Sequence, residues 1–219
     1  MTALRIGPAV ALALALVEAS GCAMGPLRPR HHVLPPPARE SRAGAPERSA
    51  GPAPGSARPE VARAVEAASS LVGRRTIVLE GVDYGPGCAA LVRAAFASAG
   101  HPLPPTATSA AALHALAGER GALAASWRPV AGDLVFLADR PGGAPTHVGL
   151  VARAEPDGTI FMLHRVARGV LRVRVNLAYP ERPTDPATGK HINDTLVVNA
   201  RAVPAGSLVV GVSDLLRRG

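Results

Sequence analysis

Apolar residues follow a helical period in the first folded part of this chain. Three segments after residue 58 carry apolar side chains three or four positions apart, and Pro59 stands where a first helical turn accepts proline. This spacing predicts helices over residues 60–72, 88–98 and 109–116.

Past Pro129 the pattern changes to short apolar runs separated by turn residues. In the last of these runs, three apolar residues alternate with Arg172 and Arg174, as expected for a strand with one exposed face. The runs predict strands over residues 133–138, 147–152, 159–165 and 170–175. Helices followed by an antiparallel meander predict an α+β domain, which we expect to occupy residues 59–219.

The tail of the domain has a weaker pattern. Residues 179–193 form a long polar loop with turn residues, and loops of this size are usually either functional or disordered. If the loop is functional, we expect it to border the cleft, with Asp194 or Arg182 in contact with the substrate. Residues 196–198 have the pattern of a final strand, whereas residues 207–218 suit a helix or a strand equally well.

The composition narrows the class of protein. The chain has 219 residues, with 24 Lys and Arg against 16 Asp and Glu, which gives a net charge of +8. The length fits one domain of roughly 150 residues plus a further segment. The composition excludes collagen-like, coiled-coil and polytopic membrane proteins. Lys190 is the only lysine, and this use of arginine is typical of a GC-rich genome, so the arginine count by itself indicates little.

The beginning of the chain has the pattern of an export signal. Arg5 precedes an apolar run that ends near Val17, and small residues then lead to Cys22. This layout predicts a signal peptide over residues 1–21. The run is shorter than the roughly 20 apolar residues that a membrane span needs. The small residues before the cysteine resemble the bacterial lipobox, which implies lipidation of Cys22, and Ala23 resembles the residue found there in lipoproteins of the Gram-negative outer membrane.

Residues 22–58 have the composition of a tether. They are rich in proline and arginine and lack hydrophobic periodicity, so we expect a disordered or partly polyproline-like segment. We therefore expect a monomeric lipoprotein of the cell envelope, at the outer membrane and facing the periplasm, with its membrane anchor at Cys22. A nucleic-acid partner is not expected for an exported protein.

Cys88, the second and last cysteine, has the surroundings of a reactive thiol. It lies at the start of a predicted helix, directly after Gly85-Pro86-Gly87. A helix N-terminus lowers the pKa of a thiol and offers free amide groups to an oxyanion. The position favours a nucleophile, and a buried, inert thiol is the alternative.

A nucleophilic thiol needs a base, and two of the seven histidines, His147 and His164, lie on predicted strands. If residues 155–158 close a hairpin with a two-residue loop, His147 lies opposite Val166. His147 and His164 are then diagonal neighbours on one face of the sheet. One histidine is thereby in a position to orient the ring of the other.

Four segments, in order, resemble the NlpC-type cell-wall cysteine peptidases. They read Gly87-Cys-Ala-Ala-Leu-Val-Arg, Pro129-Val-Ala-Gly-Asp-Leu-Val-Phe-Leu, Thr146-His-Val-Gly-Leu-Val and Phe161-Met-Leu-His. The resemblance implies a papain-like α+β fold in which N-terminal helices pack on an antiparallel sheet. It further implies Cys88 as nucleophile, His147 as general base and acid, and His164 as the orienting group. The implied reaction is hydrolysis of an amide in peptidoglycan stem peptides, without a metal or an organic cofactor.

The sequence departs from this family around the cysteine. Gly87 and Ala89-Ala90 stand where the family has Asp and Ser-Gly, and Tyr84 lies only four residues before Cys88. We expect Tyr84 and Trp127 to line the substrate cleft, and packing beneath the cleft is the alternative for each. The altered motif leaves a second hypothesis open, an inactive envelope lipoprotein that binds peptidoglycan or a partner. A CHAP-type amidase, which shares the order of cysteine and histidine, is a third.

Overall fold

The structure is a computed structural model, and it describes residues 58–124 and 128–218. The predicted signal peptide, the lipidation site Cys22, the tether up to residue 57 and Trp127 lie outside these described residues.

Three α-helices form where the apolar period predicts them. They are α1 (Pro59–Ser70), α2 (Cys88–Ser98) and α3 (Ala110–Glu119). Ser109 begins α3 as its N-cap, because its side chain accepts a hydrogen bond of 3.1 Å from the backbone N–H of Ala112. A short hairpin of β1 (Val78–Leu79) and β2 (Val82–Asp83) precedes α2. The predicted helices are confirmed, each to within three residues at either end.

The second half of the chain builds a five-stranded antiparallel sheet in the order β6-β5-β4-β3-β9. Its strands are β3 (Leu134–Leu137), β4 (His147–Ala154), β5 (Thr159–Val166), β6 (Gly169–Asn176) and β9 (Val209–Ser213). Helices on an antiparallel sheet confirm the predicted α+β class. The alternation in β6 is also confirmed, since Val173 and Val175 are buried while Arg172 is exposed.

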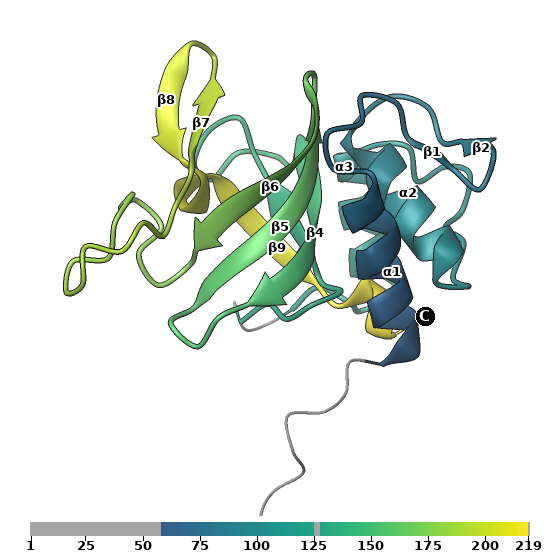
Figure 1. Cartoon of the computed structure of the whole chain (residues 1–219), viewed down its shortest axis with the longest axis horizontal. Helices are drawn as coiled ribbons and strands as arrows, with labels where there is room; N and C mark the ends of the chain where they lie inside the picture. The colour runs from purple at the N-terminus through teal and green to yellow at the C-terminus, as the bar shows by residue number, and fades with distance from the viewer. Residues whose placement is uncertain (1–57, 125–127, 219) are drawn as a thin grey trace, which may run out of the picture. The chain divides into compact units, whose positions relative to one another are not determined.

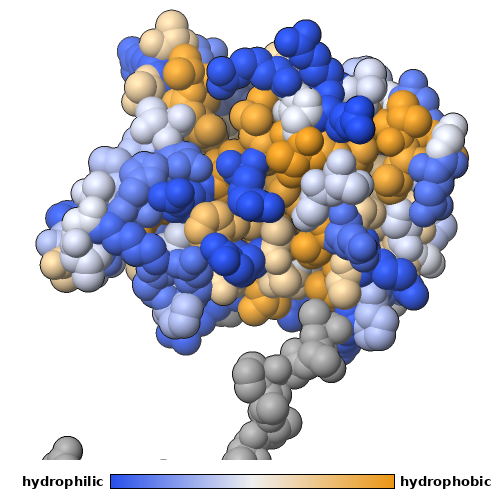
Figure 2. Space-filling model, viewed as in Figure 1, coloured by the Kyte–Doolittle hydropathy of each residue, from blue (hydrophilic) through white to orange (hydrophobic). Residues whose placement is uncertain are grey.

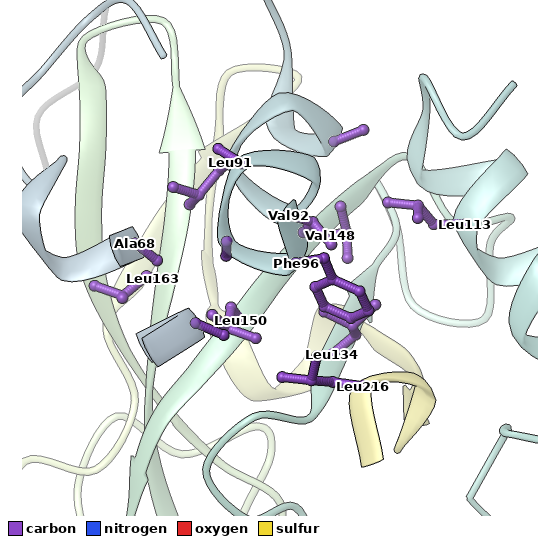
Figure 3. Close-up of a cluster of buried hydrophobic side chains, with 14 of the residues drawn as sticks. Ala68, Leu91, Val92, Phe96, Leu113, Leu134, Val148, Leu150, Leu163 and Leu216 are labelled. Atoms are coloured by element: carbon purple, nitrogen blue, oxygen red, sulfur yellow. The ribbon is translucent and has the colours of Figure 1, made fainter. Parts of the chain in front are cut away.

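The sheet is covered on both faces. On one face, α1 and α2 lie against the strands (Figure 1). Phe96 of α2 lies close to Leu134 and Leu216 in this layer (Figure 3). On the other face, Val135 and Leu137 of β3 pack with Leu208 from the tail of the chain. Because both faces are buried, all four residues of β3 are apolar and buried.

The hairpin of β4 and β5 has the predicted register for an unpredicted reason. Gly149 pairs with His164, which is the register that places His147 opposite Val166. Near the turn, however, Glu155 bonds to Thr159 around a three-residue loop that ends in Gly158 at φ 81°. A bulge between Val151 and Arg153 then shifts the register back by one residue. The two irregularities cancel, so the histidines lie on the same face.

The tail forms a second, smaller hairpin. Its strands are β7 (Thr195–Val198) and β8 (Arg201–Pro204), joined by Asn199 and Ala200, which have φ of 50° and 61°. Two consecutive residues in this left-handed region define the tight turn that suits the twist of a hairpin. The short helix η1 (Ala205–Leu208) leads into β9, and η2 (Leu215–Arg217) ends the described chain. The sequence left residues 207–218 open between helix and strand, and both occur there.

The long polar loop at residues 179–193 is held by one buried side chain. The Asn193 side-chain oxygen accepts hydrogen bonds from the backbone N–H groups of Asn176 and Gly206, at 2.7 and 3.1 Å. Its NH₂ group donates to the carbonyl oxygens of Tyr179 and Arg182, at 2.9 and 2.7 Å. The hydrogen bonds of Asn193 therefore hold the loop in one conformation.

Among the described residues, no helix combines the length and the apolar composition needed to cross a bilayer.

Candidate active site

Cys88 is the first residue of α2, and the chain enters the helix through two glycines. Gly85 and Gly87 have φ of 81° and 97°, a conformation that glycine adopts without strain. The Asp83 carboxylate accepts a hydrogen bond of 2.8 Å from the backbone N–H of Gly85 and so fixes the turn. Ala89 and Ala90 stand where the family has Ser-Gly, and both are buried in the core. Apolar packing therefore takes the place of the polar serine side chain. The thiol itself is partly exposed.

The thiol lies against the first residues of β4. Its sulfur is 3.9 Å from the carbonyl oxygen of Thr146. Burial, the largest single influence, raises the pKa of the Cys88 thiol. Hydrogen bonds from the His147 ring and from the N–H groups of Val148 and Ala89, together with the charge of His147, outweigh burial and hold the pKa below its ordinary value of 9.0. The site thus favours the thiolate.

The pKa of His147 shifts in the opposite direction, upward. Its hydrogen bond with Cys88, the largest influence, raises the pKa of His147 above 6.5, and burial opposes this. The charge of the Cys88 thiolate and the carboxylate of Asp139 raise it further. A lowered thiol pKa and a raised imidazole pKa together favour a thiolate–imidazolium pair, which is the reactive form of a nucleophilic cysteine.

The carboxylate beside His147 belongs to Asp139, a residue that the sequence did not single out. The Nε2 atom of His147 lies 3.2 Å from Oδ1 of Asp139, and both side chains are a little under half exposed. The hydroxyl of Thr146 donates to the same oxygen at 3.1 Å. Leu137 pairs with His147 across β3 and β4, so Asp139, two residues beyond Leu137, is the diagonal neighbour of His147 on that side.

His164 lies on the other side of His147, but the contact differs from the expected one. The two rings meet edge to face with their centroids 5.4 Å apart, and the described residues include no hydrogen bond between them. His164 is 2% exposed, and its Nδ1 donates to the carbonyl oxygen of Val148 at 3.1 Å. Burial, with a smaller influence from the charge of His147, lowers the pKa of His164 to about 4. The side chain is therefore neutral at physiological pH, and its hydrogen bond holds Val148, the residue after His147.

The remaining predicted site residues are less central. Tyr84 is half-buried in the loop before α2 and packs, like Cys88, against the core between helices and sheet. Trp127 lies outside the described residues, so its place in a cleft stays a prediction. Within residues 58–124 and 128–218, no cluster of three or more His, Cys, Asp or Glu side chains is arranged to hold a metal ion.

A cavity of about 610 Å³ adjoins the two histidines. Its wall includes β7 and the turn between β5 and β6, but no residue of the 179–193 loop. The sequence predicted that this loop borders the cleft. This prediction is wrong for the cavity at the histidines, because the loop is folded onto Asn193 and the hairpin that follows it takes that place.

A helix that begins at a cysteine and packs on an antiparallel sheet, with a histidine at the start of one strand, is consistent with a papain-like α+β fold. Residues 77–189, just over half of the chain, match the model of the NlpC/P60 family. The chain belongs to the NlpC/P60 family, whose members are in general cysteine peptidases or amidases of the cell wall. No curated protein and no solved structure matches the chain. The matched segment contains Cys88, His147 and His164 and ends before β7.

Proposed function

We propose that this protein is an exported hydrolase that cleaves an amide bond in peptidoglycan stem peptides, with Cys88 as nucleophile. The observation that carries the proposal is the position of the Cys88 thiol, on the first residue of α2 and against Thr146, the residue before His147, where the interaction with His147 lowers the pKa of the thiol and raises that of the imidazole. A buried, structural thiol needs no histidine that stabilises its thiolate form, so this partner favours a nucleophile. The substrate class follows from membership in the NlpC/P60 family.

The reaction begins with the transfer of the Cys88 proton to His147. The thiolate attacks the carbonyl carbon of the amide, and the backbone N–H of Cys88, which has no intrahelical acceptor at the first position of α2, stabilises the oxyanion. His147 then donates its proton to the leaving nitrogen, and the C–N bond breaks. Water, deprotonated by His147, hydrolyses the thioester and restores the thiol.

Two polar groups assist His147 in this proposal. Asp139 accepts from Nε2, so that it stabilises the imidazolium and leaves the other ring nitrogen facing the sulfur. His164, as a neutral donor to Val148, keeps the first residues of β4 in place beneath the thiol. The family resemblance implies that His164 orients His147, whereas in this proposal Asp139 has that role.

The experiment compares the purified protein with its Cys88→Ala variant on isolated peptidoglycan, with released fragments identified by mass. We expect new stem-peptide fragments from the wild type and a loss of at least about 1,000-fold in the variant. A matched control replaces His101, which follows α2 and lies outside the site. If neither protein releases fragments while both bind sacculi, the inactive peptidoglycan-binding lipoprotein is the better explanation.

Export and anchoring belong to the same proposal. The apolar run before Cys22, the small residues next to it and the proline-rich residues 22–58 support a lipid-anchored protein at the outer membrane that faces the periplasm. A lipid at Cys22 would tether the monomeric domain close to its substrate.

A further inference from the structure

Arginine side chains gather along one edge of the sheet. β6 is the last strand on that side, and the chain that follows α1 runs beside its first residues, where Val72 pairs with Val170. The N–H of Val170 donates to the carbonyl oxygen of Arg74 at 2.9 Å. A Cβ atom at Gly169 would lie only 2.8 Å from the same oxygen, so this close approach requires glycine. The approach brings the arginines that follow α1 next to those of β5 and β6.

Four of these side chains, Arg75, Arg165, Arg168 and Arg172, form what we call the arginine edge. Arg165 of β5 and Arg172 of β6 share one face of the sheet, because Arg165 pairs with Val170, two residues before Arg172. The guanidinium of Arg165 donates to the carbonyl oxygen of Arg75 at 3.1 Å. Arg168 lies in the turn between the two strands. Residues from three separate segments of the chain therefore meet here.

The positive charge of the arginine edge is not balanced by acidic side chains of the described chain. Its members are exposed, apart from Arg165, which is partly exposed. Within residues 58–124 and 128–218, none of the four forms an ion pair, whereas Arg217 pairs with Asp133 at 2.8 Å. Figure 2 shows hydrophilic residues (blue) at the top of the view, where the β5–β6 hairpin ends in Figure 1. The edge thus offers an anion several guanidinium groups.

The arginine edge continues into the candidate active site. Arg168 lines the cavity of about 610 Å³ together with His147 and His164. Among the described residues that line this cavity, none is acidic. A ligand held by the edge therefore lies next to the histidine that transfers protons in the proposed reaction. Because the charges adjoin the reacting residues, they favour a ligand that is also the substrate over an anionic bilayer.

We infer that the arginine edge binds free carboxylates of the peptidoglycan stem peptides, outside the bond that is cut, and so holds the polymer beside His147. The inference rests on the proposed function, because that function supplies the polymer. Stem peptides carry free carboxylates in addition to their amide bonds, and a guanidinium binds a carboxylate through two parallel hydrogen bonds. Since these charges are exposed, salt weakens the interaction.

Sedimentation with isolated peptidoglycan at low salt tests the inference. Every protein is the full chain with Cys88→Ala, so that the polymer stays intact. The triple variant combines Arg75→Gln, Arg168→Gln and Arg172→Gln. Arg165 is kept because it holds the segment at residue 75. We expect the triple variant to bind at least about 3-fold more weakly than the parent protein, since each exposed charge pair contributes a factor of about 1.4 to 5. Conversion of the polymer carboxylates to amides should remove this difference.

A matched control removes three exposed arginines elsewhere, with Arg120→Gln, Arg182→Gln and Arg201→Gln. It has the same net charge as the triple variant and should bind like the parent protein. Equal thermal unfolding of the two variants, followed by circular dichroism, excludes a folding defect.

The inference is overturned if the triple variant binds like the parent protein, or if amidation of the polymer changes nothing. It is also overturned if the triple variant loses binding only to vesicles of phosphatidylglycerol and phosphatidylethanolamine, because the charges then serve a membrane. Failure of the proposed function is a separate result. If the chain with Cys88 intact releases no fragments while arginine-dependent binding persists, the hydrolase proposal fails and the inference stands.

Discussion

Replacement of His164 by Asn tests the role of a buried, neutral histidine. Because Val148 offers only a carbonyl oxygen to Nδ1, this nitrogen carries the hydrogen in the folded protein. The NH₂ group of Asn occupies nearly the same position as Nδ1, so His164→Asn keeps the donor and removes the titrating ring. The perturbation therefore separates the charge of the side chain from its hydrogen bond.

The magnitude follows from the two pKa values of His164. The pKa is about 4 in the folded protein, because burial disfavours the imidazolium, and 6.5 in the unfolded chain. Between these values the unfolded chain binds more protons than the folded one, so the free energy of unfolding falls as the pH falls. The contribution is fully present above pH 6.5, and about 3 kcal/mol is lost as the pH approaches 4.

The assay is urea unfolding, followed by circular dichroism, at a series of pH values from 7.5 to 4.5. We expect the wild type to lose most of these 3 kcal/mol relative to His164→Asn over this range, while the two proteins unfold similarly at pH 7.5. His164→Leu, which lacks the donor, should be less stable than His164→Asn at every pH by about 1–3 kcal/mol. Equal pH dependence in wild type and His164→Asn would refute the neutral, buried state of this histidine.

Two further predictions concern Asp139 and Cys22. In Asp139→Asn the imidazolium loses its carboxylate, so its pKa should fall. The rate of Cys88 alkylation by iodoacetate, an anion that the imidazolium attracts, should then decline at a lower pH than in the wild type, and the rate at pH 7 should be reduced by no more than about five-fold, since the pair is half exposed. An unchanged profile, measured on the Cys88 peptide by mass spectrometry, would show that Asp139 does not act on His147. In cells fed radiolabelled palmitate, the protein should take up label, Cys22→Ser should take up none, and Cys88→Ser should be labelled like the wild type. Label in Cys22→Ser would contradict the anchor at that residue.

The general fold was predictable from local pattern. Helical spacing around Phe96 and alternation in β6 arise from burial of one side of each element, and both appear in the sequence as periods. The family resemblance rested on short segments around Cys88, His147 and His164, and the matched segment includes all three. These segments are local, and a local pattern needs no knowledge of how distant parts of the chain meet.

The register of the β4–β5 hairpin was predicted correctly through two errors that cancel. The turn has three loop residues rather than two, and the bulge near Ala152 compensates. A single bulge without the longer loop would have moved one histidine to the other face. Turn chemistry indicates that a hairpin exists, but bulges depend on contacts across the sheet that no short pattern contains.

The sequence by itself determined the α+β class, the helix that begins at Cys88 and the strands that carry the two histidines, because each depends on neighbouring residues. Only the tertiary structure decided that Asp139 is the group within hydrogen-bonding distance of His147 Nε2, since the path of the nine-residue connection between β3 and β4 is not contained in a periodic pattern. It also decided that the β7–β8 hairpin forms a wall of the cavity beside His147. Both depend on how a loop or a hairpin folds back on the sheet, which the spacing of apolar residues does not specify.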